Sequence, residues 1–174
     1  MNEKQETLRD FILAGLNTPT VRGRANGSVK EVRYIFNNMI AKYSSSLDVW
    51  SISSKARIAM KDNGVDLTKP YPRNQFSNKP WMCEHPVPAT VVLDRLLELR
   101  LEERNSVEVT KILDLVGPPC VLLKDEDKEL RNMGLKESMP VDWEWGPNVH
   151  ARYDKAKIEV STEPFRVEGG RVRR

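Results

Sequence analysis

The chain has 174 residues, of which 39% are hydrophobic and 30% are charged, and its formal net charge is +3. This composition is typical of a globular protein and excludes an intrinsically disordered chain. No apolar run approaches the roughly 20 residues that cross a bilayer, the polar N-terminus is unlike a secretory signal, and two cysteines are too few for a disulfide framework. We therefore expect a cytoplasmic protein with no membrane partner.

The N-terminal region, residues 1–64, is predicted to be helical. Apolar residues recur at helical spacing in three of its segments: 3–16, 28–44 and 48–63. Ser28 and Glu31 form a capping box at the start of the second segment, and Asn63-Gly64 is a typical end for the third.

The second region, residues 65–160, is predicted to combine helices with short strands. Prolines interrupt its first part, and helical patterns then cover four segments: 89–104, 106–116, 125–133 and a short one that begins at Pro147. The apolar run 120–123 is typical of a buried strand, and residues 157–160 favour an edge strand. Residues 161–174 are expected to form a basic, flexible tail. The predicted fold class is α+β, mainly helical.

Charge is distributed unevenly along the chain. Residues 21–62 contain eight Lys and Arg against three acidic residues, and the segment from Arg166 onward contains four Arg against one Glu. Residues 94–144 contain thirteen acidic residues against eight basic ones. Basic ends around an acidic middle favour a polyanionic partner, and we expect that partner to be DNA. Ordinary surface charge would explain the same pattern without any partner.

Five basic residues are candidates for contacts with DNA phosphates: Arg22, Arg24, Lys55, Arg57 and Arg152. The first two lie beside glycines in a loop and would form an arm. The next two lie near the start of a predicted helix, where phosphate contacts are favourable. The last lies on the short helix near the C-terminal end.

The stretch WMCEHPVP, residues 81–88, places a carboxylate directly beside one of the two histidines. Histidine is the usual general base near neutral pH, and carboxylates bind hard divalent cations. Neighbouring side chains on an extended segment diverge, so Glu84 would reach a metal ion while His85 activates a water molecule. Alternatively, the two residues form a solvated turn pair or a cap at a helix start.

The stretch EHPVP, residues 84–88, resembles the first half of the HNH, or ββα-metal, nuclease motif, in which an acidic residue and His-x-x-Pro end a first strand. The segment VLLKDEDKELRNMG is similar to the second half, a strand followed by a helix. The resemblance covers about residues 79–134 and implies a small ββα-like element with a helical insertion. The metal ligand on the helix is carried over to Asp127 first, and then to Glu126 or Asn132. The insertion is longer than is usual in the family, and the usual Asn or His of the helix is not clearly matched.

The resemblance implies an endonuclease of the restriction or phage type that hydrolyses phosphodiester bonds of DNA with Mg²⁺ or Mn²⁺. Glu84 and Asp127 would bind the ion together with a phosphate oxygen, and His85 would deprotonate the attacking water. The acidic start of the 125–133 helix has a second explanation, because carboxylates stabilise helix N-termini without any metal.

Other functions use the same residues differently. A noncatalytic regulatory protein would bind DNA or a protein, with its acidic middle facing a basic partner. A structural Zn²⁺ ion would need every Cys and His of the chain, namely Cys83, His85, Cys120 and His150, and their spacing matches no compact zinc knuckle. A homodimer is compatible with either function.

Trp143 and Trp145 flank a glutamate in the segment DWEWGPN. Paired indole rings can stack on bases or sugars. Packing over the edge of the core is the more common use of such a pair, and we favour it.

Overall fold

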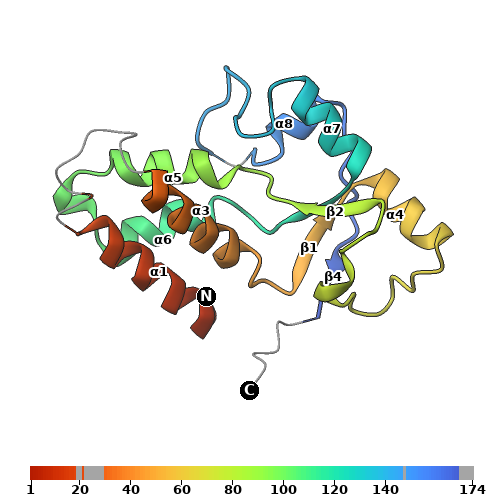
Figure 1. The fold of residues 1–174 in the computed structure, drawn as a ribbon, viewed down its shortest axis with the longest axis horizontal. Coiled ribbons are helices and arrows are strands. Elements are labelled where there is room, and N and C mark those ends of the chain that lie inside the picture. The colour runs from red at the N-terminus through yellow and green to blue at the C-terminus, as the bar shows by residue number, and fades with distance from the viewer. Residues whose placement is uncertain (19–20, 22–29, 147, 169–174) are drawn as a thin grey trace.

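A mixed β-sheet and a cluster of helices lie side by side along the long axis of the molecule (Figure 1). This computed structural model describes residues 1–18, 21, 30–146 and 148–168. In chain order its α-helices and strands are α1 (Glu3–Leu16), α3 (Lys30–Ser44), β1 (Val49–Ile52), α4 (Ser54–Asp62), β2 (Trp81–Glu84), α5 (Ala89–Glu98), α6 (Ser106–Asp114), β3 (Cys120–Leu123), α7 (Lys124–Asn132), α8 (Ala151–Lys155) and β4 (Phe165–Arg166). Short 3-10 helices, Arg73–Gln75 and Leu101–Glu103, lie between them. The fold is α+β and mainly helical, as the sequence predicts.

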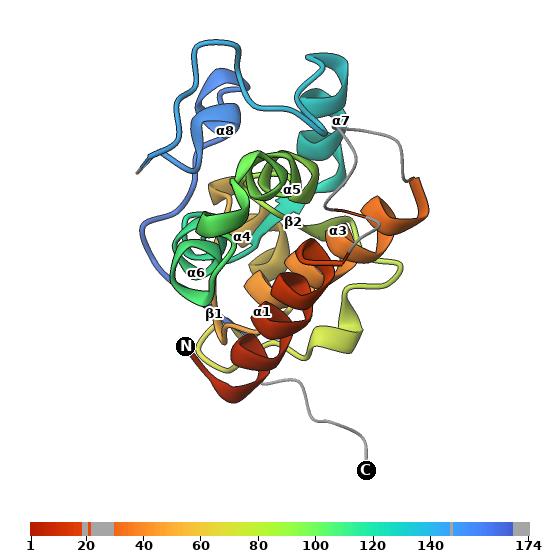
Figure 2. The ribbon, with the colours of Figure 1, turned by 90° about the vertical axis from the view of Figure 1, so that its left-hand side faces the viewer.

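The helical cluster consists of α1, α3, α5 and α6, and Figure 2 turns it toward the viewer. Buried apolar side chains at helical spacing fill its centre, among them Ile12, Leu16, Phe36, Ile40, Leu93, Leu96, Val109 and Leu113. Gly15 lets α1 and α3 approach closely, because a Cβ atom at this position would lie 2.7 Å from Cζ of Phe36. Helices α5 and α6 pack against α1 and α3, and all four helices contribute side chains to one core.

The sheet has the strand order β2-β3-β1-β4. Strands β2 and β3 are antiparallel, whereas β1 is parallel to β3 and antiparallel to β4. Cys83 lies opposite Val121 on the face that packs against α4, and Glu84 lies opposite Cys120 on the face beneath α7 and α8. Glu84 therefore faces the layer formed by α7 and α8.

The ββα-like arrangement predicted for residues 79–134 consists of β2, β3 and α7. Helix α7 begins directly after β3 and packs against both strands. The insertion between the two strands contains α5 and α6, and these two helices belong to the helical cluster. The strands that form the unit are thus neighbours in space although a long helical segment separates them in the sequence.

Residues 49–52 form strand β1, so the helix predicted over 48–63 begins too early. Trp50 and Ile52 are buried while the residues between and before them are not, which is the alternation of a strand. Pairing with β3 on one side and β4 on the other overrides the helical spacing of these residues. Helix α4 begins at Ser54, and the Ser53 hydroxyl caps it by accepting a hydrogen bond from the Ala56 N–H at 3.0 Å.

The C-terminal segment also differs from the prediction. Residues 157–160 form no strand, and Val160 makes only an isolated bridge with Ser53. Strand β4 lies further along the chain, and Phe165 and Val167 are buried. The flexible tail predicted from residue 161 therefore begins too early, because packed chain continues to residue 168.

Several helix boundaries differ from the predicted ones. Helix α5 ends at Glu98 rather than at residue 104, and α6 ends at Asp114 rather than at residue 116, with Asn105 as its N-terminal cap. The capping box of Ser28 and the helix start at Pro147 lie outside the described residues, which begin again at residues 30 and 148. Among the described residues, no helix has both the length and the apolar character that crossing a membrane requires.

Candidate functional site

Glu84 is the last residue of β2, and its carboxylate is bound by Arg152 of α8. The Arg152 side chain is completely buried, and its Nη2 donates to Oε1 of Glu84 at 2.5 Å. The remaining donors of the guanidinium group bind backbone oxygens of the residues around it: His85, Pro86, Leu135 and Lys136. Arg152 therefore joins the end of β2 to the segment that follows α7.

This burial overturns the prediction that Arg152 contacts DNA phosphates. A guanidinium group with no exposed surface, whose donors already bind one carboxylate and four carbonyl groups, is not available to a ligand in this arrangement. In the sequence, ARYDK has the appearance of an exposed basic helix. Nothing in its spacing indicates that Arg152 and Tyr153 point inward.

Asp127 lies in the first turn of α7, and its side chain is 7% exposed. Its Oδ2 lies 3.5 Å from Nη2 of Arg131 and 3.6 Å from Nζ of Lys136. Its Oδ1 is buried and has no hydrogen-bond partner within the described part of the chain. A buried carboxylate oxygen without a partner is uncommon, and a cation would satisfy it.

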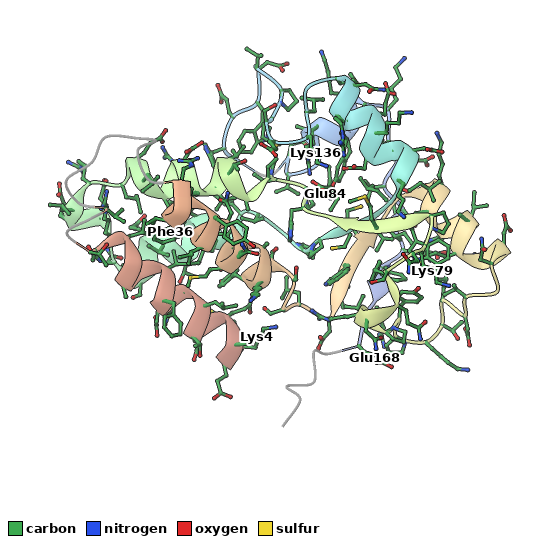
Figure 3. All side chains as sticks on the ribbon, in the orientation of Figure 1. Lys4, Phe36, Lys79, Glu84, Lys136 and Glu168 are labelled. Carbon is green, nitrogen blue, oxygen red and sulfur yellow. The ribbon has the colours of Figure 1, made fainter. Side chains whose placement is uncertain are left out.

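The fold brings Glu84 and Asp127 close enough to interact electrostatically. Burial raises the pKa of Glu84 above its usual range, Arg152 opposes this increase, and the negative charge of Asp127 adds to it. Lys136 lies near both carboxylates, and Figure 3 shows it beside Glu84 above the sheet. Helix α7 also contacts β2, so the end of this strand and the helix belong to one packed unit.

His85 follows Glu84 but is held by a different element. Its Nδ1 lies 2.9 Å from Oγ of Ser44, the last residue of α3, and Ser44 is itself buried. Burial, and then the positive charge of Arg152, lower the pKa of His85 to about 4. The imidazole is therefore neutral at physiological pH. The contact of its ring is with α3, whereas Asp127 contacts residues of α7 and of the segment after it.

The donor set fits a hard divalent cation in part. Mg²⁺ takes oxygen ligands and commonly uses only one or two carboxylates, with water and substrate phosphates completing its shell. Glu84 and Asp127 supply two carboxylates, and Oδ1 of Asp127 is without a partner. No three His, Cys, Asp or Glu side chains of the described residues are grouped to hold a metal, so the ion would depend on water and phosphate for its other ligands.

The alternative ligands on α7 do not join this site. Oε2 of Glu126 accepts hydrogen bonds from the Leu123 N–H at 2.9 Å and from Oγ of Ser53 at 2.6 Å. Glu126 therefore caps α7 and ties it to the start of α4. Asn132 is exposed at the end of α7.

A zinc site built from the four Cys and His residues is not assembled. Cys83 and Cys120 project from opposite faces of the sheet. Cys83 pairs with Val121 and shares its face, whereas Cys120 precedes Val121 on β3 and therefore points to the other face. His150 stacks on the ring of Tyr153 with 5.6 Å between centroids. Two thiols on opposite faces of one sheet cannot share a tetrahedral ion.

The predicted DNA-binding residues differ in their availability. Arg57 binds Glu163, with 2.8 Å between its Nη1 and Oε2, and also donates to the backbone carbonyl groups of Glu163 and Pro164. Lys55 is exposed on α4. Arg22 and Arg24 lie outside the described residues.

A basic flank on α7 was missed by the sequence analysis. Lys124, Lys128 and Arg131 follow each other at spacings of four and three residues, so they share one exposed side of the helix. Lys136 extends this set because it contacts Asp127 at the inner edge of the same flank. We call these four residues the basic flank. The alternation of Lys with Asp and Glu in KDEDKELR conceals it, since Asp125 and Glu129 lie on another side of α7 and Asp127 lies at the inner edge of the flank.

The chain was compared with known proteins at three levels. No family model, no curated protein and no solved structure matches it.

Proposed function

We propose that this protein is a metal-dependent DNA endonuclease whose active site lies on the β2–β3–α7 unit. One observation carries the proposal: Glu84 and Asp127, which are far apart in the sequence, lie close enough for their charges to interact, at the end of the strand that His85 follows. The second carboxylate has an unpartnered oxygen, and the basic flank borders it.

The residues of the chain have separable roles in this proposal. The basic flank would bind the phosphates on either side of the scissile bond, because Lys and Arg side chains that line one surface contact the DNA backbone without reading its sequence. Glu84 and Asp127 would hold Mg²⁺ or Mn²⁺, which when bound would stabilise the negative charge that develops on the phosphate. With Nδ1 of His85 directed at Ser44, Nε2 is the nitrogen that would take the proton from the attacking water.

The first test is a plasmid-nicking assay with Mg²⁺ or Mn²⁺. We expect wild-type protein to nick the plasmid, and Glu84→Gln, Asp127→Asn and His85→Gln each to lower the rate about 100-fold or more. Glu129→Gln is the matched control, because it removes an exposed carboxylate from another side of α7. Circular dichroism would show which variants remain folded. An intact plasmid with both ions, at every protein concentration tested, would contradict the endonuclease.

A second candidate, a noncatalytic protein that binds DNA, is favoured by the role of Arg152. Its buried contact with Glu84 gives this carboxylate a structural role, and that role needs no metal ion. This candidate predicts that the plasmid stays intact while the protein still retards it in a gel, and that Glu84→Gln leaves the retardation unchanged.

A further inference from the structure

An open cavity of about 580 Å³ lies between the segment that follows α7 and the outer side of α8. Its walls include the two indole rings of the DWEWGPN segment and four charged side chains, namely Asp142, Glu144, Asp154 and Lys155. Arg152 and Tyr153 point from the other side of α8 into the buried layer above the sheet. The cavity is therefore separate from the proposed nuclease site.

Trp143 and Trp145 form a rigid aromatic corner in this cavity. Their ring centroids are 4.9 Å apart and the ring planes are inclined at 58°. Nε1 of Trp143 donates to the backbone carbonyl of Asn148 at 2.8 Å, which fixes the first ring. Both rings also pack against the helical cluster, as the sequence analysis favoured. They thus cover the core and line the cavity at the same time.

The charge around the aromatic corner is predominantly negative. Asp142, Glu144 and Asp154 are exposed carboxylates, whereas Lys155 is the one basic residue among the described lining residues. Asp154 is oriented by Asn148, whose Nδ2 donates to its Oδ2 at 3.3 Å. An excess of carboxylates repels nucleic-acid phosphates, so the stacking of bases on these rings is disfavoured here.

The same carboxylates are not arranged for an inorganic ion. No group of three His, Cys, Asp or Glu side chains within the described ranges is close enough together to ligate a metal. A larger cation with diffuse charge does not need several carboxylates grouped around it. It can rest on the electron-rich face of an indole ring while carboxylates at the rim neutralise its charge.

We propose that this cavity binds an organic cation, an alkylammonium or guanidinium group, with Trp143 and Trp145 contacting the cation and the carboxylates at the rim neutralising it. A free polyamine and the basic side chain of a partner protein present the same chemistry to the site. The expected affinity for a small probe is weak, because the cavity is open to solvent and the carboxylates are exposed.

The test uses the indole N–H signals of the full-length protein in ¹H–¹⁵N correlation spectra. Trp50 and Trp81 belong to the core beside the sheet and serve as internal references. Tetramethylammonium is compared with tert-butanol, and arginine amide with citrulline amide, because each pair has similar shape and differs in charge. We expect the cations to shift the signals of Trp143 and Trp145 and leave those of the references unchanged.

Charge variants then test the role of the rim. The double variant Asp142→Asn/Glu144→Gln should weaken the binding of arginine amide about three- to five-fold, and Lys155→Gln should strengthen it. Glu129→Gln, on α7, should have no effect. Tighter binding of spermidine than of an arginine-containing peptide would identify a free polyamine as the ligand, and the opposite order would identify a protein.

Three results would overturn the proposal. Equal shifts with tetramethylammonium and tert-butanol, and with arginine amide and citrulline amide, which lacks the guanidinium charge, would indicate an apolar or sugar-binding pocket. Shifts of the same signals on addition of a DNA oligonucleotide would indicate stacking on bases. No shift with tetramethylammonium or arginine amide at concentrations of about 50 mM would show that the cavity binds no cation, since cation–π contacts at exposed sites remain detectable in this range.

Discussion

Arg152 and His85 are both polar residues that the sequence suggests are exposed, whereas the fold buries Arg152 completely and His85 in part. The guanidinium group of Arg152 has no exposed surface, and the ring of His85 contacts a buried hydroxyl group on α3. Both lie beside Glu84, so groups from two helices, α8 and α3, meet at the end of β2. Contacts of this kind join residues that are far apart in the sequence. Periodicity within one segment contains no information about them.

The buried imidazole of His85 predicts a specific pH dependence of stability. Its pKa is lowered from 6.5 to about 4 in the folded state, so between these values only the unfolded state takes up a proton at this residue. The free energy of unfolding should therefore fall as the pH decreases from about 6.5 to about 4, by up to about 3 kcal/mol for His85 alone. Urea denaturation at a series of pH values measures this change.

His85→Gln is the variant that isolates this effect. The pKa of His150 is also lowered, mainly by burial, but His150 is present in both proteins and cancels in the difference. We expect the difference in unfolding free energy between wild type and variant to change through this pH range and to be constant above it. A difference that does not change with pH would show that the ring is solvated and titrates normally.

At the scale of elements, local sequence patterns predict most of the helices. They fail for strand β1, whose conformation is determined by pairing with other strands. The amphipathic pattern of α1 gives its boundaries, and the run of β3 followed by an acidic helix start gives the second half of the ββα-like unit. The strand at 49–52 was missed because its apolar residues also fit a helix. Only the neighbouring strands β3 and β4, which are distant in the sequence, favour the extended form.

The contact between α1 and α3 gives a prediction at this scale. Gly15→Ala should lower the free energy of unfolding by about 1 kcal/mol, because the new methyl group would overlap Cζ of Phe36. The energetic cost of this overlap should exceed the gain in helix propensity on replacing Gly by Ala. Urea denaturation at neutral pH measures the change. Adding Phe36→Leu to this variant should remove part of the overlap, so the two substitutions should be less than additive. An increase in stability for Gly15→Ala alone would mean that the two helices move apart freely.

For the whole molecule, the question is which surface a polyanion would contact. The sequence suggests the basic N-terminal region and the C-terminal tail, and part of both lies outside the described residues. Among the described residues, Arg57 is engaged by Glu163. Within the basic flank, Arg131 and Lys136 are engaged by Asp127, whereas Lys124 and Lys128 are exposed on α7. Exposed basic side chains thus also lie within the segment with the largest acidic excess.

Lys128→Ala tests this surface. If DNA binds along α7, the variant should bind duplex DNA more weakly and, to a similar extent, for every sequence. The dependence of affinity on salt concentration should decrease by about one unit of slope. Fluorescence anisotropy with a labelled duplex at several salt concentrations measures both. Lys4→Ala is the control, since Lys4 lies on α1, away from α7 (Figure 3). Equal losses for both variants would indicate diffuse charge attraction rather than contact at α7.

The packing of the insertion has a consequence for any attempt to dissect the protein. Helices α5 and α6 share one core with α1 and α3, so a fragment spanning residues 79–134 would expose the apolar sides of both inserted helices. Such an excised piece should collapse or aggregate rather than keep its strands aligned. The β2–β3–α7 unit of this chain therefore does not fold independently. Transferring it to another protein would require the N-terminal helices α1 and α3 to be transferred as well.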